Sequence, residues 1–571
     1  MSNELAVKAL NQYRKRDIFP YLGLRYYLES STGRQSRWIK NVCTRLTTDV
    51  VHSSYLKTYH FKEFSNGGFL HRDIYLPAPN EILSEAALIS EISKYDSFKP
   101  KPYVYSYRFS KKNEKSGVFQ PYFNGFKERH KSIADACRSI EGGIVLYTDI
   151  KKFYPSIKSV DALTTWERSC DNSDIDDKYK RLGREILKKH ESVSLCDGTC
   201  NGVLTGPLFS HVIANLLLDQ TDIQMYEISK GKYWRYVDDV VFVGTNDEVA
   251  KWRELLGEKF FKLNLELHDG DKDFQVSCKD WLEGEDDFDN TFGIEWISLI
   301  SGVKRFLIAN PSKAKELQES FKDDHIRIPV IDYTNAVKES TYLQRFQDWM
   351  GKYKWAIKSV KPITIERLLN QAKKCEKVFK LKLDVLLNKG EPVSIYEGKR
   401  FTLKLRYLSG RLLYLLSRQE LSKLYPKLEV RPELYFIAKT MEAVATRDIS
   451  LVLHMGVDAT HAAAQLLRVD QGIVTISKDT KTSSVFEQSL AVLEINGVEH
   501  DFKGSETELK SFATAENISK LMSSPNGFIK EVACLHGILP SRHQEALDSS
   551  FDRDEELSLD ILNQLQKSSH C

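Results

Sequence analysis

Two short apolar runs that end on aspartate constrain this sequence more than any other feature. Residues 143–150 are rich in β-branched and aromatic side chains, which indicates a buried strand that ends near Asp149. Residues 232–237 and 240–243 read as two further strands, joined by a very tight turn at Asp238 and Asp239. Strand ends that share one edge of a sheet would bring these three carboxylates together.

The neighbouring segments complete a recognisable order of elements. An apolar helix is expected within residues 204–219, another helix over 252–261 and a last strand at 274–276. The order strand, helix, strand-turn-strand, helix, strand is that of a small ferredoxin-like α/β unit. Upstream, a helix is expected over residues 84–95, and alternating aromatic residues predict a strand over 103–109.

Three convergent carboxylates suit nucleotidyl transfer. Two magnesium ions about 3.5–4 Å apart can stabilise both the attacking and the leaving oxygen of a phosphoryl group. Magnesium prefers hard oxygen ligands and keeps several waters, so two or three carboxylates suffice. Taken singly, the pair Asp238 and Asp239 could be ordinary turn residues, and Asp149 an ordinary helix cap. Only the joint pattern favours a metal site.

The joint pattern resembles reverse transcriptases. Residues 236–239 read Tyr-Val-Asp-Asp, similar to the Y-x-D-D signature, and residues 149–157 are similar to the first palm motif of that family. Between them, residues 201–219 resemble the glycine turn and helix that hold template and incoming nucleotide. The resemblance covers about residues 60–295 and implies a right-hand polymerase with fingers and a ferredoxin-like palm.

The resemblance also implies roles for individual residues. Asp149 and Asp238 would bind both Mg²⁺ ions, with the Ile150 carbonyl as a further ligand and Asp239 at the second ion; Mn²⁺ is the alternative cation. The residues assigned to the incoming nucleotide are Arg108, Ile150, Tyr154, Gly206 and Pro207. Tyr154 stands where the family places an aromatic that blocks a 2′-hydroxyl, and Arg108 where relatives contact the triphosphate. Each has a plainer alternative, a core tyrosine and a surface strand residue.

Two further segments match the family. Lys272 stands where relatives keep a lysine that protonates pyrophosphate, although it could be a solvated lysine beside two aspartates. Residues 291–295 resemble the strand that supports the primer end. In a departure from the family, Leu204 and Thr205 replace the Pro-Gln of many relatives, which leaves open how a template is held and whether a conventional one is used.

After about residue 296 the sequence becomes mainly helical. Long helical patterns run over residues 365–388, 403–424 and 432–455, and an acidic amphipathic helix is expected over 552–566. Two alternating runs around Asn496-Gly497 predict a hairpin near 485–502. Such a mainly α-helical, repeat-like C-terminal region makes the chain most similar to the abortive-infection and other defence-associated reverse transcriptases of bacteria. Retron and group II intron enzymes are the alternatives within the family.

Length and composition bound this interpretation. The 571 residues predict two to four domains, taken as 1–100 (a basic and aromatic N-terminal region with fingers), 101–300 (fingers and palm) and 301–571 (a helical thumb-like and accessory region). The net charge of +3 decides nothing about nucleic-acid binding. No membrane helix is expected, and nine cysteines without paired spacing favour reduced thiols in a cytoplasm, which the resemblance implies to be that of a bacterium.

The resemblance also implies partners, and two rival functions remain open. The expected partners are deoxynucleotides, an RNA template or DNA product, a noncoding RNA in some relatives, and further copies of the chain. Basic and aromatic residues before residue 49 could bind nucleic acid or could form a helix with core anchors. A rival function is a fused ribonuclease of HEPN type, in which Arg447 and His454 would share one face of a helix. Another is an oligomeric scaffold, against which the three retained aspartates argue.

Overall fold

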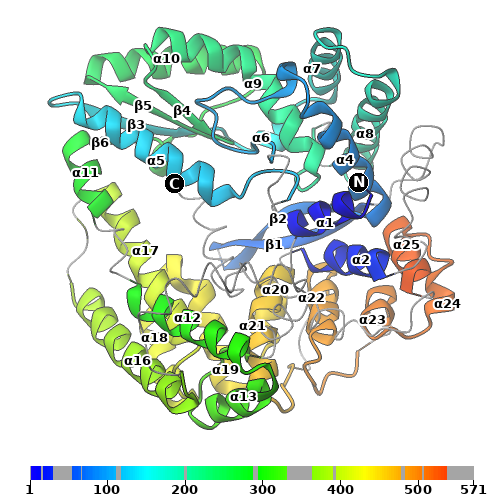
Figure 1. Ribbon diagram of the computed structural model, residues 1–571, viewed down its shortest axis with the longest axis vertical. Helices are drawn as coiled ribbons and strands as arrows, with labels where there is room; N and C mark the ends of the chain where they lie inside the picture. Colours follow the sequence, from blue (N-terminus) through cyan, green and yellow to red (C-terminus); the bar gives the residue numbers. More distant parts are fainter. Residues whose placement is uncertain are drawn as a thin grey trace.

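A computed structural model of the chain describes most of its residues. The described residues are 2–13, 17–29, 55–65, 67–110, 117–198, 202–286, 293–330, 363–389, 392, 394–477, 482–504 and 507–536. The expected helix at 552–566 and most of the basic positions before residue 49 lie outside them. The described chain is a mixed α/β structure with small antiparallel sheets and many helices (Figure 1).

The first organising element is a four-stranded antiparallel sheet with the strand order β4-β5-β3-β6. Its strands are β3 (Ile144–Asp149), β4 (Tyr233–Tyr236), β5 (Asp239–Gly244) and β6 (Phe274–Ser277). In the order of the chain, helix α9 (Leu208–Ile228) directly precedes β4, and helix α10 (Asn246–Lys262) comes between β5 and β6. All four expected strands of this unit are therefore confirmed, within one or two residues at their ends.

Both faces of this sheet are covered, which explains why its strands are apolar on both sides. Alternate strand side chains point to opposite faces. Leu146, Val240 and Phe242 pack with α9 and α10. On the other face the sheet packs against α5 (Tyr122–Arg138) and α11 (Cys278–Asp286), and Figure 1 shows α10 and α5 on opposite sides of the strands. The side chains of this second face are Val145, Tyr147, Trp234, Val241, Val243, Phe274 and Val276.

Further described helices precede α9 in the chain. Those in the first 200 residues are α1 (Ser2–Tyr13), α2 (Ile18–Glu29), α4 (Pro79–Ile92), η1 (Asp96–Phe98), α6 (Phe153–Ser156), α7 (Ser159–Asp171) and α8 (Asp177–Cys196). The expected helix at 84–95 is α4, which begins and ends a few residues earlier. Tyr13, Tyr21 and Tyr26 are buried in the core, so these three aromatics are core anchors rather than base-stacking residues.

A long hairpin connects the two halves of the described chain. Strand β1 (Tyr55–Ser65) pairs with β2 (Gly68–Pro77), and Figure 1 shows the hairpin between the upper sheet and the lower helices. The ring of Phe61 packs against Phe436 at a centroid distance of 5.9 Å, and its amide donates to Asp458 at 3.0 Å. The hairpin is thus held by side chains that lie almost 400 residues later in the sequence.

The described residues from Ile294 onward are mainly helical, as expected. Their elements are α12 (Ile294–Ala309), η3 (Pro311–Lys313), α13 (Ala314–Asp323), α16 (Ile365–Leu387), α17 (Ile395–Leu412), α18 (Arg418–Glu429), η4 (Pro432–Leu434), α19 (Tyr435–Thr446), α20 (Ser450–Met455), α21 (Val457–Asp470), α22 (Ser484–Ile495), α23 (Glu508–Ala513), α24 (Ile518–Leu521) and α25 (Gly527–His536). A short 3-10 helix, η2 (Gly270–Lys272), lies before them and directly precedes β6. Helices α12 to α22 share one apolar core.

The prediction of a hairpin near residues 485–502 is wrong. The segment instead begins with helix α22, capped by the side chain of Ser483, and the helix ends at Asn496-Gly497. Gly497 has a φ of 70°, and the amide of Val498 donates to the carbonyl of Leu493 at 3.3 Å. This is the left-handed glycine ending of a helix, which uses the same Asn-Gly pair as a hairpin turn.

Three other expectations need correction. Residues 103–109 form turns with isolated bridges at Val104 and Phe109 rather than a strand, and Tyr107 has a left-handed φ of 50°. The segment resembling a primer-supporting strand lies partly outside the described residues, and its last two residues begin helix α12. The helices predicted at 403–424 and 432–455 are each divided into two, the first at Ser417, the N-cap residue of α18.

None of the described helices is both long and apolar enough to span a membrane.

Candidate active site

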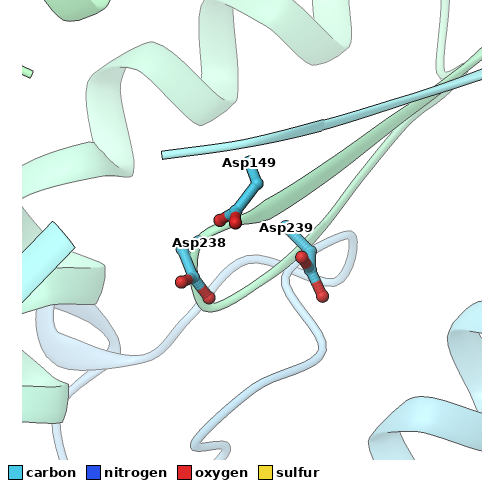
Figure 2. Close-up of side chains that lie close together, drawn as sticks. All are labelled: Asp149, Asp238 and Asp239. Carbon is cyan, nitrogen blue, oxygen red and sulfur yellow. The ribbon is translucent and has the colours of Figure 1, made fainter. Parts of the chain in front are cut away.

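The three aspartates that the sequence singles out come together at one end of the four-stranded sheet. One carboxylate oxygen from each of Asp149, Asp238 and Asp239 lies within 4.8 Å of those of the other two. Asp149 and Asp239 are 6% and 5% exposed, and Asp238 is half-buried. Figure 2 shows the three side chains side by side at the turn between β4 and β5.

Strand register produces this convergence. Asp149 is the last residue of β3 and stands directly opposite Asp239, the first residue of β5. The amide of Ile150 donates to the carbonyl of Asp238 at 3.2 Å, and the amide of His268 donates to the carbonyl of Asp149 at 2.6 Å. Since backbone bonds fix both the strand end and the turn, the carboxylates are held by the sheet itself.

The turn that carries Asp238 has an unusual backbone. Val237 has a φ of 57°, a left-handed conformation that a β-branched residue rarely adopts. Two hydrogen bonds hold it: its amide donates to the Ser106 hydroxyl at 2.8 Å, and its carbonyl accepts from Arg235 at 2.8 Å. Such conformations persist only where the surroundings impose them, and they concentrate at functional sites.

A buried ion pair supports Arg235 beneath the turn. Arg235 and Asp222 are 0% and 1% exposed at their side chains, and two nitrogens of the guanidinium donate to the two carboxylate oxygens at 2.8 and 2.7 Å. The hydroxyl of Tyr233 also donates to Asp222 at 2.6 Å, and Arg235 reaches Asn215 at 3.2 Å. Asn215 in turn donates to the carbonyl of Ser106 at 3.2 Å, so the network closes on itself.

The electrostatics of the cluster favour a bound cation. Burial, together with the nearby Asp149 carboxylate, raises the pKa of Asp238 to about 7. Burial and the adjacent Asp238 also raise the pKa of Asp239 well above its ordinary value, an effect that the Arg129 guanidinium opposes. Arg129 is itself 2% exposed and lies 5.3 Å from the ring of Tyr236. Gathered buried carboxylates are costly unless positive charge compensates them.

The donor set fits a hard divalent cation. All three groups offer carboxylate oxygens, the ligand type that Mg²⁺ prefers. One oxygen of Asp149 is buried without a hydrogen-bond partner among the described residues, while the other accepts from Lys272 at 2.6 Å. A buried acceptor of this kind beside two further carboxylates is suited to act as a metal ligand.

The structure also brings several of the expected nucleotide-side residues near this end of the sheet. Lys272, predicted as a catalytic residue, contacts Asp149 directly. Tyr154 lies on the short helix α6 that follows Asp149, and its hydroxyl bonds to His211 of α9 at 2.6 Å. Burial raises the pKa of Tyr154 well above its ordinary value, so the hydroxyl stays neutral.

The turn at Thr205 and Gly206 is hydrogen-bonded to strand β2 of the long hairpin. The Thr205 carbonyl accepts from the amide of Tyr75 at 2.8 Å. Gly206 has a φ of 121°, and a Cβ there would lie 2.6 Å from the Tyr75 carbonyl oxygen, so this position requires glycine. Pro207 directly precedes α9 as its N-cap residue. The turn is therefore tightly constrained.

Arg108 is placed differently from the other expected residues. Its guanidinium donates to the carbonyls of Val104 and Pro102 at 2.8 and 2.5 Å and pairs with Glu128 at 2.8 Å. It lines a shallow surface cavity of about 360 Å³ that none of the three aspartates lines. The hydrogen bonds of Arg108 in the described part of the chain thus hold the 102–108 turn.

Sequence reasoning missed the residues that support the cluster. They are Ser106, Arg129, His211, Asn215, Asp222 and Arg235. One signal could have found three of them: His211, Asn215 and Asp222 are polar residues of a largely buried helix, spaced to lie within about 40° of one another around it. Polar residues sharing one face of a buried helix indicate a partner on that face.

The geometry expected of a HEPN ribonuclease is not found. Arg447 ends α19 in a left-handed conformation, whereas His454 lies on the separate helix α20. The Arg447 side chain donates to the carbonyls of Ile473 and Asp470, and the His454 ring packs against Phe486. The two side chains therefore do not share one helical face and have structural contacts of their own.

No family model matches the chain, and a search of curated proteins found no match.

Proposed function

We propose that this chain is a polymerase of the reverse-transcriptase type, which adds deoxynucleotides to a 3′-hydroxyl. The observation that carries the proposal is the convergence of Asp149, Asp238 and Asp239 at one sheet edge, in a sequence whose motifs resemble that family. The order β3-α9-β4-β5-α10-β6 with the sheet order β4-β5-β3-β6 supports it, since a ferredoxin-like palm has this arrangement.

The three aspartates would hold the cations. Asp149 and Asp238 would bind both ions, with the Ile150 carbonyl as a further ligand, and Asp239 would bind or orient the second. Two Mg²⁺ ions in such a site stabilise the attacking and leaving oxygens of an in-line displacement. The reaction would form a bond between the 3′-oxygen and the α-phosphorus and break the bond from that phosphorus to the α,β-bridging oxygen. The 3′-hydroxyl would lose its proton to solvent, and pyrophosphate would depart.

Protein side chains would position the nucleotide around this centre. Tyr154 would stand against the sugar and exclude a 2′-hydroxyl, which selects deoxynucleotides. Gly206 and Pro207 would form the turn beside the nucleotide, which the hairpin holds in place through Tyr75. Lys272, already 2.6 Å from Asp149, would pass a proton toward the departing pyrophosphate. Arg108 would reach the triphosphate only after releasing Glu128.

The remaining features of the proposal rest on the resemblance. They are a cytoplasmic location in a bacterium, a role in defence against phage, and an RNA template, noncoding RNA or untemplated DNA product. Priming from a protein hydroxyl and assembly into oligomers belong to the same group of properties. The helical half that follows Ile294 would be the thumb-like and accessory region of such an enzyme.

Incorporation of labelled deoxynucleotides tests the proposal. The purified chain is incubated with each labelled deoxynucleotide and Mg²⁺, with and without a primer–template, and the products are checked for protease-sensitive attachment. We expect incorporation by the wild type and a loss of at least about 100-fold in the double variant D238N/D239N, because carboxylate ligands are replaced by neutral amides.

A matched control removes an aspartate outside the cluster. Asp177 is exposed in the first turn of α8, and its carboxylate lies 3.8 Å from the Lys180 ammonium, so D177N should keep incorporation within about twofold of the wild type, the loss of one exposed ion pair being small. Equal activity of the wild type and D238N/D239N would contradict the proposal. Dependence on the primer–template separates copying from untemplated synthesis.

A further inference from the structure

The face of α9 that supports the aspartate turn also carries a stacked aromatic cluster. The imidazole of His211 stacks on the ring of Tyr107, with centroids 3.7 Å apart and planes 6° apart. On the same imidazole, Nδ1 is 2.6 Å from the hydroxyl oxygen of Tyr154. The Tyr154 ring stands edge-on to His211, at 72° and 5.3 Å. His211 therefore contacts both tyrosines at once.

The cluster is rigid on the side away from Tyr154. Phe119, which is 2% exposed, packs edge-on against both Tyr107 and His211 at centroid distances of 5.3 and 6.1 Å. Tyr107 has a left-handed backbone and lies one residue from Ser106, which bonds to the aspartate turn. His211 is thus fixed by its helix, by Tyr107 and by Phe119.

The Tyr154 side chain packs against the same core, and its hydroxyl meets both His211 and Tyr107 of the cluster. It lies on a four-residue helix entered through Lys152, whose φ of 44° makes a sharp turn after the strand. Its adjacent ring is Phe153, at 5.5 Å. The hydrogen bond to His211 anchors the far end of the side chain, and a tyrosine ring held at both ends cannot swing about its first two side-chain torsions.

We propose that His211 is a positioning residue that fixes the Tyr154 ring and thereby sets the discrimination between deoxynucleotides and ribonucleotides. This inference rests on the proposed polymerase function, in which Tyr154 faces the sugar. A ring that is free to move leaves room for a 2′-hydroxyl, whereas an anchored ring does not. The imidazole is needed for its nitrogen, and the stack on Tyr107 holds that nitrogen in place.

Selectivity measured on paired variants tests the inference. The ratio of kcat/KM for the preferred deoxynucleotide to that for its ribonucleotide is measured for the wild type and for H211F, Y154F and H211F/Y154F. H211F keeps a ring for the stack but lacks the nitrogen, and Y154F keeps the ring but lacks the hydroxyl. His211→Asn, which keeps a polar group near the position of Nδ1, serves as the conservative variant.

We expect H211F and Y154F each to lower the selectivity ratio by about threefold to tenfold, the effect of one net hydrogen bond. The double variant should fall no further than either single variant, and His211→Asn should regain part of the selectivity. A merely structural role would lower deoxynucleotide and ribonucleotide use together and leave the ratio unchanged.

The results separate a failure of the role of His211 from a failure of the proposed polymerase function. A ratio unchanged in H211F while Y154F lowers it, or a double variant equal to the product of the singles, overturns the role of His211 alone. Absence of incorporation by the wild type overturns the proposed function instead. Thermal melting of each variant is measured in parallel, and His211→Leu, which also lacks the nitrogen, replaces H211F in the cycle if H211F melts below the assay temperature.

Discussion

Removal of the buried guanidinium beneath the aspartate turn is the most informative test of the architecture. In R235M, the carboxylate of Asp222 stays buried at 1% exposure without its two charged hydrogen bonds, and the Val237 carbonyl loses its donor. Breaking a buried ion pair by removing one partner costs about 3–5 kcal/mol. For a cooperative unit of about 200 residues this lowers the melting temperature by roughly 6–20 °C, at about 2–4 °C per kcal/mol.

The assay is differential scanning calorimetry of the full chain, with R184M as the matched control. Arg184 pairs with Glu167 at 3.1 Å, but both side chains are 45% exposed, so its loss should change stability by less than about 1 kcal/mol. A melting temperature of R235M within 2 °C of R184M, roughly 1 kcal/mol at this size, would refute the reasoning. Urea unfolding followed by tryptophan fluorescence supplies an independent value.

Three further predictions concern neighbouring residues. G206A should lose most of its incorporation activity, since a Cβ would lie 2.6 Å from the Tyr75 carbonyl oxygen and the φ of 121° is strained for alanine; an unchanged specific activity would show that the turn is not needed. K272M should slow incorporation by about 100-fold or more, as expected for a lost general acid, and a change below about twofold would exclude that role. Burial raises the pKa of Glu85 to about 8, so the folded state binds an extra proton between about pH 4.5 and 8 and wild-type stability falls as pH rises through this window. E85Q should remove that part of the fall in melting temperature, and identical pH profiles for E85Q and the wild type would contradict the assignment.

The sheet and its aspartates could be predicted from the sequence because their signals are local. The β-branched run before Asp149 and the short runs around Asp238 and Asp239 each specify a strand within a few residues, and the structure confirms all three strands. Convergence of the carboxylates then follows from strand pairing, in which Asp149 stands opposite Asp239.

The errors came from signals that two structures share. Asn496-Gly497 ends a helix with glycine in the left-handed region, and the same pair is the strongest short hairpin signal. The aromatic alternation at 103–109 is that of a strand, yet Tyr107 turns the chain and its ring stacks on His211. That ring contact joins residues 104 positions apart, which no window of local sequence contains.

The supporting network could not be predicted for the same reason. Arg235 reads locally as one residue of a short strand, and its partners Asp222 and Asn215 lie on the preceding helix. Only the fold shows that these polar groups satisfy one another in the interior, where an unpaired polar group would cost free energy. Support of an active site is therefore a tertiary property, whereas the carboxylates themselves are marked by local motifs.

A change of metal preference tests most directly whether the aspartates are metal ligands for nucleotidyl transfer. In D238C a soft thiolate replaces a hard carboxylate, and thiolate suits Mg²⁺ poorly but accepts softer cations such as Cd²⁺. Deoxynucleotide incorporation by D238C should be lost in Mg²⁺ and partly restored when Cd²⁺ is added, while D238A should stay inactive with either ion. Wild-type incorporation by D238C and D238A in Mg²⁺ alone would contradict the assignment of Asp238, and with it the proposed metal site.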